Sequence, residues 1–199
     1  MASVLSGVLA PKRFKGNGLL LRPLCEADAS ALDESMLDPG VLRWGVGRAV
    51  ATAPADERAR IWLTSRLNGW SVGTAAFALT DPREGTLLGY LGLRDVHRVP
   101  DQAVAGYWVA PSARGRGVAA RALDAASTWA FTPEDEGGLG LHRISLDHAL
   151  VNPASCRTAL RAGFAEEGVM RESFVEPDGT RHDSHLHARL ATDPRPDLG

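Results

Sequence analysis

The spacing of hydrophobic residues in the first half of the chain predicts mainly strands. Short apolar runs that end at Gly, Pro or Asp are typical of buried sheet segments. Two helices are also expected, and in the second of them Ile61, Thr64 and Leu67 recur at helical spacing. The expected strands are Leu19–Pro23, Ala75–Leu79, Thr86–Val96 and Ala103–Val109, and the expected helices are Glu26–Leu32 and Asp56–Leu67. A turn at Asp81–Gly85 would join two of these strands, so an antiparallel meander is predicted.

After Pro111 the pattern becomes helical and then alternates between helix and strand. A helix beginning near Val118 would place Val118, Ala122, Ala125 and Trp129 on one face. A second helix would begin at Asn152-Pro153, an N-cap followed by proline, and end at Gly163. The expected strands are His142–His148, Phe164–Met170 and His185–Leu190, with a turn at Pro177–Gly179. This order predicts the α+β class, with a strand–loop–helix–strand–helix unit in the second half.

Composition and charge narrow the class of protein. The 199 residues carry 22 Lys and Arg against 24 Asp and Glu, a formal net charge of −2. Nucleic-acid binding is not expected, because proteins that bind phosphate backbones usually carry a basic excess. No apolar run is long enough to span a membrane, and Met1–Pro11 lacks the basic start of a secretory signal. With two cysteines that form no pattern, we expect a cytoplasmic protein with one domain over residues 1–190 and a frayed tail, Ala191–Gly199.

A glycine-containing loop between a strand and a helix, residues 106–119, carries most of the information about function. Free N–H groups at such a junction bind anionic oxygens, and the helix dipole adds to the attraction. A P-loop is excluded because Val118-Ala119, not Lys-Ser/Thr, follows Gly117. A dinucleotide-binding fingerprint is disfavoured because the acidic residues 134–136 lie in a linker and a meander precedes the loop.

The loop reads Arg114-x-x-Gly117-x-Ala119, which resembles the Arg/Gln-x-x-Gly-x-Gly/Ala acyl-CoA signature of the GNAT acetyltransferase superfamily. Other segments, in the same order, resemble its RimJ/RimL-type branch. They are Leu21-Arg22-Pro23-Leu24, Gly106-Tyr107-Trp108-Val109 with Pro111, Leu141-His142-Arg143-Ile144, Asn152-x-x-Ser155 and Leu160-x-x-Gly163-Phe164-x-x-Glu167-Gly168. The resemblance spans about residues 19–190. It implies the GNAT fold, a mixed and mostly antiparallel central sheet flanked by helices.

The resemblance also implies acetyl-CoA as the cosubstrate and a set of residues that bind it. The strand before the loop would pair with the pantetheine arm, and the N–H of Val109 would polarise the thioester carbonyl. The loop would hold the diphosphate, and Asn152 would face the pantetheine, although helix capping explains Asn152 as well. The implied CoA-binding residues are Trp108, Val109, Ala110, Arg114, Gly115, Arg116, Gly117, Val118, Ala119, Asn152 and Ser155.

The sequence offers several candidates for the catalytic residues. Many family members have glutamate two residues before the Gly-Tyr-Trp glycine, where this chain has Val104. Ser155 matches a serine beside the thiolate in this branch, and Cys156 is expected to be a core residue. A positioned base contributes about 10²–10⁴-fold to amine attack. The candidate replacements for the missing glutamate are His148 and His97, then Asp95 and Glu172. The alternative role for His148 is that of a buried core histidine.

A metal site is not expected from the sequence. Of His182, His185 and His187, only the last two share a strand face, and no cysteine is near them in sequence.

The expected activity is transfer of an acetyl group from acetyl-CoA to a primary amine by direct attack. The acceptor would be a peptide or protein N-terminus, as the branch suggests, or a small amine, with a homodimer left open. The region Leu32–Trp70 would select the acceptor. Trp44, Trp62 and Trp70 are candidates for its wall, although core packing is expected for at least two of them. The rival hypothesis is a non-catalytic acyl-CoA-binding regulatory module, which the valine at position 104 motivates.

Overall fold

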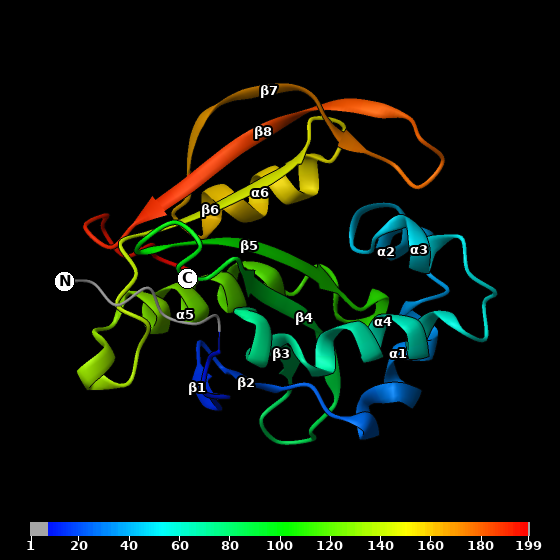
Figure 1. The fold of residues 1–199 in the computed structure, drawn as a ribbon, viewed down its shortest axis with the longest axis horizontal. Coiled ribbons are helices and arrows are strands. Elements are labelled where there is room, and N and C mark those ends of the chain that lie inside the picture. The colour runs from blue at the N-terminus through cyan, green and yellow to red at the C-terminus, as the bar shows by residue number, and fades with distance from the viewer. Residues whose placement is uncertain (1–7, 199) are drawn as a thin grey trace.

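The computed structural model describes residues 8–198, which form one eight-stranded sheet with helices on both faces (Figure 1). The strand order is β1-β2-β3-β4-β5-β6-β8-β7. Every neighbouring pair is antiparallel except β5 and β6, which run parallel. The strands are β1 Phe14–Gly16, β2 Leu19–Pro23, β3 Ala75–Thr80, β4 Leu87–Arg94, β5 Gln102–Val109, β6 Arg143–Ala149, β7 Ala165–Val175 and β8 Arg181–Leu190. The predicted α+β fold with a mixed, mostly antiparallel sheet is confirmed.

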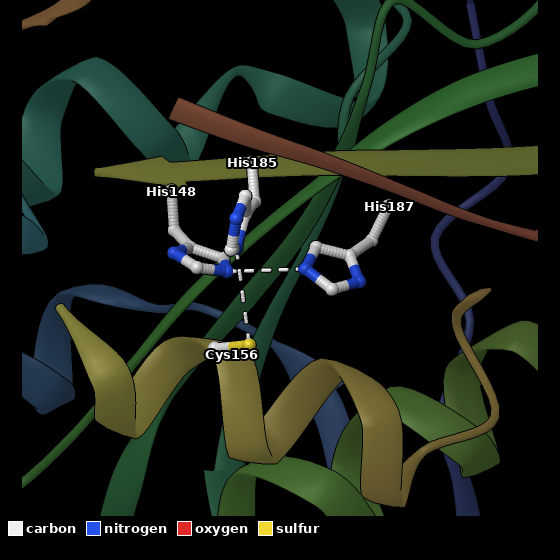
Figure 2. A group of neighbouring side chains, drawn as sticks. All are labelled: His148, Cys156, His185 and His187. Atoms are coloured by element: carbon white, nitrogen blue, oxygen red, sulfur yellow. Dashed lines mark hydrogen bonds between the residues drawn. The ribbon is translucent and has the colours of Figure 1, made fainter. Parts of the chain in front are cut away.

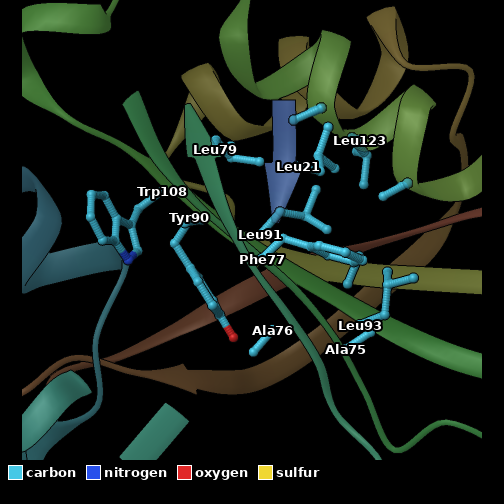
Figure 3. Close-up of a cluster of buried hydrophobic side chains, with 14 of the residues drawn as sticks. Leu21, Ala75, Ala76, Phe77, Leu79, Tyr90, Leu91, Leu93, Trp108 and Leu123 are labelled. Atoms are coloured by element: carbon cyan, nitrogen blue, oxygen red, sulfur yellow. The ribbon is translucent and has the colours of Figure 1, made fainter. Parts of the chain in front are cut away.

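Two groups of helices cover the two faces of the sheet. Trp62 packs edge-on against Tyr90 and Trp108 on one face, with ring centroids 4.9 and 5.4 Å apart. On the other face, Trp129 meets Phe77 at 5.5 Å between ring centroids. Figure 3 shows Tyr90 and Trp108 pointing to the opposite side of the sheet from Phe77. The helices are α1 Ala29–Ser35, α2 Pro39–Trp44, α3 Arg48–Ala51, α4 Arg58–Leu67, α5 Val118–Phe131 and α6 Pro153–Arg161. Short 3₁₀ turns are η1 Glu26–Asp28, η2 Gly69–Val72, η3 Pro111–Ala113 and η4 Glu134–Glu136. Because Trp62 belongs to α4 and Trp129 to α5, these two helices lie on opposite faces.

The parallel contact between β5 and β6 is short. Its register runs from Gln102 opposite Arg143 to Val104 opposite Ser145. Beyond this point β5 continues to Val109 beside β4, while β6 continues to Ala149 beside β8. The two strands therefore separate in the middle of the sheet, and the gap opens toward the C-terminal end of β5.

The last two strands are longer than the sequence pattern predicts. β7 reaches Val175 instead of Met170, and β8 begins at Arg181 instead of His185. Their pairing has register shifts, and Glu172 adopts a φ of 51°. Much of β7 is exposed, so its residues do not alternate between apolar and polar. This is why periodicity underestimates its length.

The segment after β8, which is expected to be a frayed tail, makes contacts with the rest of the domain. Arg195 forms an ion pair with the buried Asp124 at 3.2 Å. Arg161 donates to the carbonyl of Leu198 at 2.7 Å, and Leu198 packs against the core. The sequence is rich in proline and polar residues there, so these contacts have no periodic signature. Residue 199 and most of Met1–Pro11 lie outside the described residues.

Among residues 8–198, none of the helices has the length and apolar character needed to cross a membrane.

Candidate active site

A cleft of about 730 Å³ lies where β5 separates from β6. Its lining comes from β5, from the loop that leads into α5, from β6 and from α6, with part of α2 closing one side. The cleft therefore joins the gap in the sheet to the N-terminus of α5. Such a shape suits a long ligand with an anionic end.

The backbone of Val109 faces the gap. Ala110 donates its N–H to the carbonyl of Leu88 on the β4 side, at 2.9 Å. Because successive residues of a strand direct their hydrogen-bonding groups to opposite edges, Val109 directs its N–H away from β4. The β5–β6 pairing ends five residues earlier, at Val104, so this edge of β5 is open to a ligand.

The loop before α5 uses two glycines in the left-handed region. Gly115 has a φ of 74°, and Gly117, the N-cap of α5, has a φ of 67°. Side chains rarely adopt this conformation, and a Cβ at Gly115 would meet no described atom within 4 Å. The loop thus leaves room for a ligand to approach backbone N–H groups at the positive end of the helix.

Among the described residues, three arginines line the cleft, and only one of them belongs to the set that the sequence suggests. Arg114 lines the cleft and forms an ion pair with Asp38, the N-cap of α2, with one N–O distance of 3.2 Å. The hydrogen bond from Arg114 lowers the pKa of Asp38. Arg157 and Arg161 of α6 also line the cleft, although no motif marks them. Ala110 and Arg116, which the resemblance includes, lie outside its lining.

Ser155 and Tyr107 meet on the α6 side of the cleft. Their hydroxyl oxygens are 2.9 Å apart. Burial raises the pKa of Tyr107 to about 12, so the phenol keeps its proton at neutral pH. Asn152 caps α6 by accepting a hydrogen bond from the backbone N–H of Ser155 at 3.3 Å, and it also lines the cleft. The capping role is therefore present, and the pantetheine contact of Asn152 stays a prediction.

A carboxylate that the sequence analysis missed lies in the same cleft. Asp147 lines it, and its side chain is 33% exposed. Ser145 pairs with Val104, so Asp147, two residues further on, projects to the same face of the sheet as Val104. That face is covered by α4, whereas Tyr107 and Ser155 lie on the other. Arg94, the β4 neighbour of Val104, lies 3.9 Å from Asp147.

The family follows from a comparison with known proteins. Residues 18–165 match the family model described as an acetyltransferase (GNAT) domain, which is more than half of the chain. The chain belongs to the GNAT acetyltransferase family. The resemblance seen in the glycine loop and its neighbouring motifs is thereby confirmed.

Related proteins of this GNAT family carry names from ribosomal-protein modification. The chain is 32% identical over 107 residues to "Putative ribosomal N-acetyltransferase YdaF" of Bacillus subtilis, covering 54% of this chain and 55% of that protein. It is 29% identical over 109 residues to the ribosomal-protein-serine acetyltransferase of Escherichia coli, covering 54% and 57%. These alignments thus span about half the length of the curated relatives.

Solved structures agree on the fold. Mycobacterium smegmatis RimJ in complex with CoA-disulfide superimposes with a TM-score of 0.74 at 23% identity, over 91% of this chain and 87% of that one. RimL, a ribosomal L7/L12 alpha-N-protein acetyltransferase in complex with coenzyme A, gives 0.74 at 21% identity, over 90% and 98%.

The histidines expected as bases in this GNAT acetyltransferase occupy two different places. His97 lines a second cavity of about 340 Å³ and faces Glu134 at 4.0 Å, so the fold does not bring it to the cleft. His148 lines the cleft, but both its ring nitrogens are engaged, by the carbonyl of Ala149 at 3.0 Å and by His187 at 3.2 Å. The other suggested carboxylates, Asp95 and Glu172, lie outside the cleft lining.

Two of the three tryptophans lie in the core, as expected from the sequence, and the third lines the cleft. Trp62 and Trp70 are core residues, 0% and 5% exposed. Trp44 of α2 lines the cleft and contacts Phe174 of β7 at 5.6 Å between ring centroids. Beside it, Arg43 donates to the carboxylate of Glu176 at 2.6 and 2.7 Å. These contacts join α2 to the β7–β8 hairpin at the cleft.

Proposed function

We propose that this protein transfers an acetyl group from acetyl-CoA to a primary amine. The separation of β5 from β6 carries the proposal, because it joins an open strand edge to a glycine loop at a helix N-terminus. The open edge of β5 at Val109 suits the amides of a pantetheine arm, and the loop around Gly115 and Gly117 suits a diphosphate. The nearby Arg114, Arg157 and Arg161 provide positive charge for phosphates.

The proposed acceptor is the N-terminus of a protein. The relatives named for ribosomal-protein acetylation support this class of acceptor. An α-amine has a pKa of about 8, so a useful fraction is uncharged at neutral pH, in contrast to a lysine amine near 10.4. The acceptor would enter past Trp44 and Phe174, on the face that bears Asp147. A cytoplasmic location belongs to this proposal, and the two free cysteines are compatible with it.

Groups on both faces of the cleft take part in the proposed reaction. Acetyl-CoA supplies the thioester carbon that the amine nitrogen attacks. Asp147 accepts the proton that the amine loses as the C–N bond forms. The Val109 N–H donates to the carbonyl oxygen. As the C–S bond breaks, CoA leaves as the thiolate, and the Ser155 hydroxyl donates a hydrogen bond to the sulfur while it accepts one from the Tyr107 hydroxyl, 2.9 Å away, which keeps its proton.

The direct test measures CoA release by the full chain with a panel of amines and independently measured acetyl-CoA binding. Turnover is expected with peptides that have a free α-amine, and little with the same peptides after N-terminal acetylation. Tight acetyl-CoA binding without turnover on peptides, polyamines or aminoglycosides would instead favour the non-catalytic binding module.

A Gly117→Val substitution tests the diphosphate loop. A β-branched residue at a φ of 67° is strained, and its Cβ would approach the Arg161 guanidinium to 3.4 Å. Hydrogen bonds to charged groups contribute about 1.5–3 kcal/mol, so CoA affinity should fall about 10–100-fold. Isothermal titration calorimetry measures this directly.

Gly85→Val is the matched control. Gly85 has a φ of 74° in the β3–β4 turn and does not line the cleft, so the substitution imposes similar backbone strain at a position outside the lining. CoA affinity should be unchanged in this variant. Equal affinity in both folded variants would show that the loop does not hold the diphosphate.

A further inference from the structure

Three histidines and a cysteine converge between the sheet and α6, beside the cleft (Figure 2). They are His148 of β6, Cys156 of α6, and His185 and His187 of β8. One potential ligand atom from each residue lies within 4.8 Å of the others. His148 and His187 are buried, at 4% and 0% exposure.

The fold creates this cluster from residues that are distant in sequence. In the antiparallel pairing of β6 with β8, His148 lies directly opposite His185, and His187 follows two residues later on the same face. The helix α6 crosses that face and directs Cys156 toward the rings (Figure 2). The sequence argues against a metal because no cysteine is near the β8 histidines, but the fold brings one to them.

The outer nitrogen of each ring faces an oxygen. His148 Nδ1 is 3.0 Å from the carbonyl of Ala149, and His187 Nδ1 is 3.3 Å from that of Phe164. A carbonyl oxygen only accepts, so both Nδ1 atoms carry hydrogen. His185 Nε2 lies 3.7 Å from a carboxylate oxygen of Glu166, an ion-pair distance. Metal-binding histidines are held in this way, with the other nitrogen directed to a carbonyl or carboxylate.

The inner nitrogens face one another. His148 Nε2 and His187 Nε2 are 3.2 Å apart. With hydrogen on both Nδ1 atoms, two neutral rings would oppose their lone pairs at this distance, so a cation between them is favoured. Two nitrogens on a tetrahedral zinc ion, at about 2.0–2.1 Å each, would be about 3.4 Å apart. The third nitrogen, His185 Nδ1, lies 4.0 Å from Cys156 Sγ.

We propose that His148, Cys156, His185 and His187 bind one divalent transition-metal ion, with zinc as the best match to three imidazoles and one thiolate. Four protein ligands leave no open position, so the ion is structural. It ties the first turns of α6, which carry Asn152 and Ser155, to β6 and β8. The proposal does not depend on acetyl transfer. It also gives His148 a role other than that of a base.

The test uses the full chain after removal of metal by a chelator. Titration with Zn²⁺ against a chromophoric chelator should show one ion per chain, and Tm should rise when the ion is added. Titration with Co²⁺ should give the visible bands of a tetrahedral site and a thiolate charge-transfer band in the near ultraviolet. Failure to bind either ion in competition with the chelator would overturn the proposal.

Three variants that leave the buried histidines intact locate the site. Cys156→Ser should abolish the charge-transfer band, whereas Cys25→Ser, which changes the other free cysteine, should retain it. Glu166→Gln should weaken Zn²⁺ binding about 10–100-fold, the usual effect of losing a residue that orients a ligand. An unchanged charge-transfer band in Cys156→Ser would place any bound metal elsewhere and refute the assignment.

Discussion

Replacing Asp147 by asparagine is expected to lower kcat about 10²–10⁴-fold, the contribution of a positioned base. Asparagine has a similar shape but cannot accept the proton of the amine. Asp147 lines the cleft and does not belong to the loop that would bind the diphosphate. Acetyl-CoA affinity should therefore be unchanged, and steady-state kinetics with calorimetry would measure both quantities.

Asp95→Asn is the matched control for this prediction. Asp95 also forms an ion pair with Arg94, at 3.2 Å, but it lies outside the cleft lining. Its φ of 55° suits asparagine, so the fold should be preserved. Equal losses in the two aspartate variants would contradict the assignment of Asp147 as the base.

Replacing Asp124 by asparagine is expected to lower the free energy of unfolding by about 3–5 kcal/mol, as when one partner of a buried ion pair is removed. Asp124 is 1% exposed and contacts Arg189 at 2.7 Å, Arg195 at 3.2 Å and Asn17 at 2.9 Å. The change would leave the guanidinium of Arg189, itself 3% exposed, without a charged partner. Urea denaturation at neutral pH measures the loss.

The pH dependence of stability gives a second test at Asp124. Burial alone would raise its pKa, but hydrogen bonds from Asn17, Arg189 and Arg195 outweigh burial and the pKa is lowered. Because the folded pKa lies below the unfolded value of about 3.9, this contribution is present above about pH 4. It is lost as the pH falls through the folded pKa, and Asp124→Asn should lack that part of the acid transition.

Glu167→Gln provides a comparison on the surface. Glu167 pairs with Arg143, but its side chain is 37% exposed, and exposed pairs contribute about 0–1 kcal/mol. A loss at Asp124 no larger than the loss at Glu167 would show that the buried network does not stabilise the fold.

The sequence pattern predicted the elements that have clear local signals, such as helix caps or an amphipathic face. The N-cap and proline at Asn152-Pro153 and the stop at Gly163 fixed α6, and the amphipathic face beginning at Val118 fixed α5. The short helices α2 and α3 were missed because six- and four-residue helices have too few turns to show periodicity. Asp38-Pro39, a cap followed by proline, was the signal available for α2.

The candidate site was predictable where one contiguous segment forms it. The loop from Arg114 to Ala119 could be recognised from its Arg-x-x-Gly-x-Ala spacing together with the motifs that follow it in order. Asp147 could not, because its relation to Val104 depends on the register between β5 and β6, which are far apart in sequence. The positions of Arg157 and Arg161 likewise depend on how α6 packs against the loop.

The brief pairing of β5 with β6 gives the sheet an edge in its interior. Unpaired strand edges usually lie at the border of a sheet, where proteins must protect them from joining other chains. Here the edge from Ala105 to Val109 lies within a cleft, flanked on each side by strands and helices. Because strands and helices flank this edge, it is withdrawn from pairing with the sheet of another chain, whereas a thin, unbranched ligand with spaced amide groups would suit it. The same geometry therefore protects this one edge from edge-to-edge aggregation and favours a ligand of that shape.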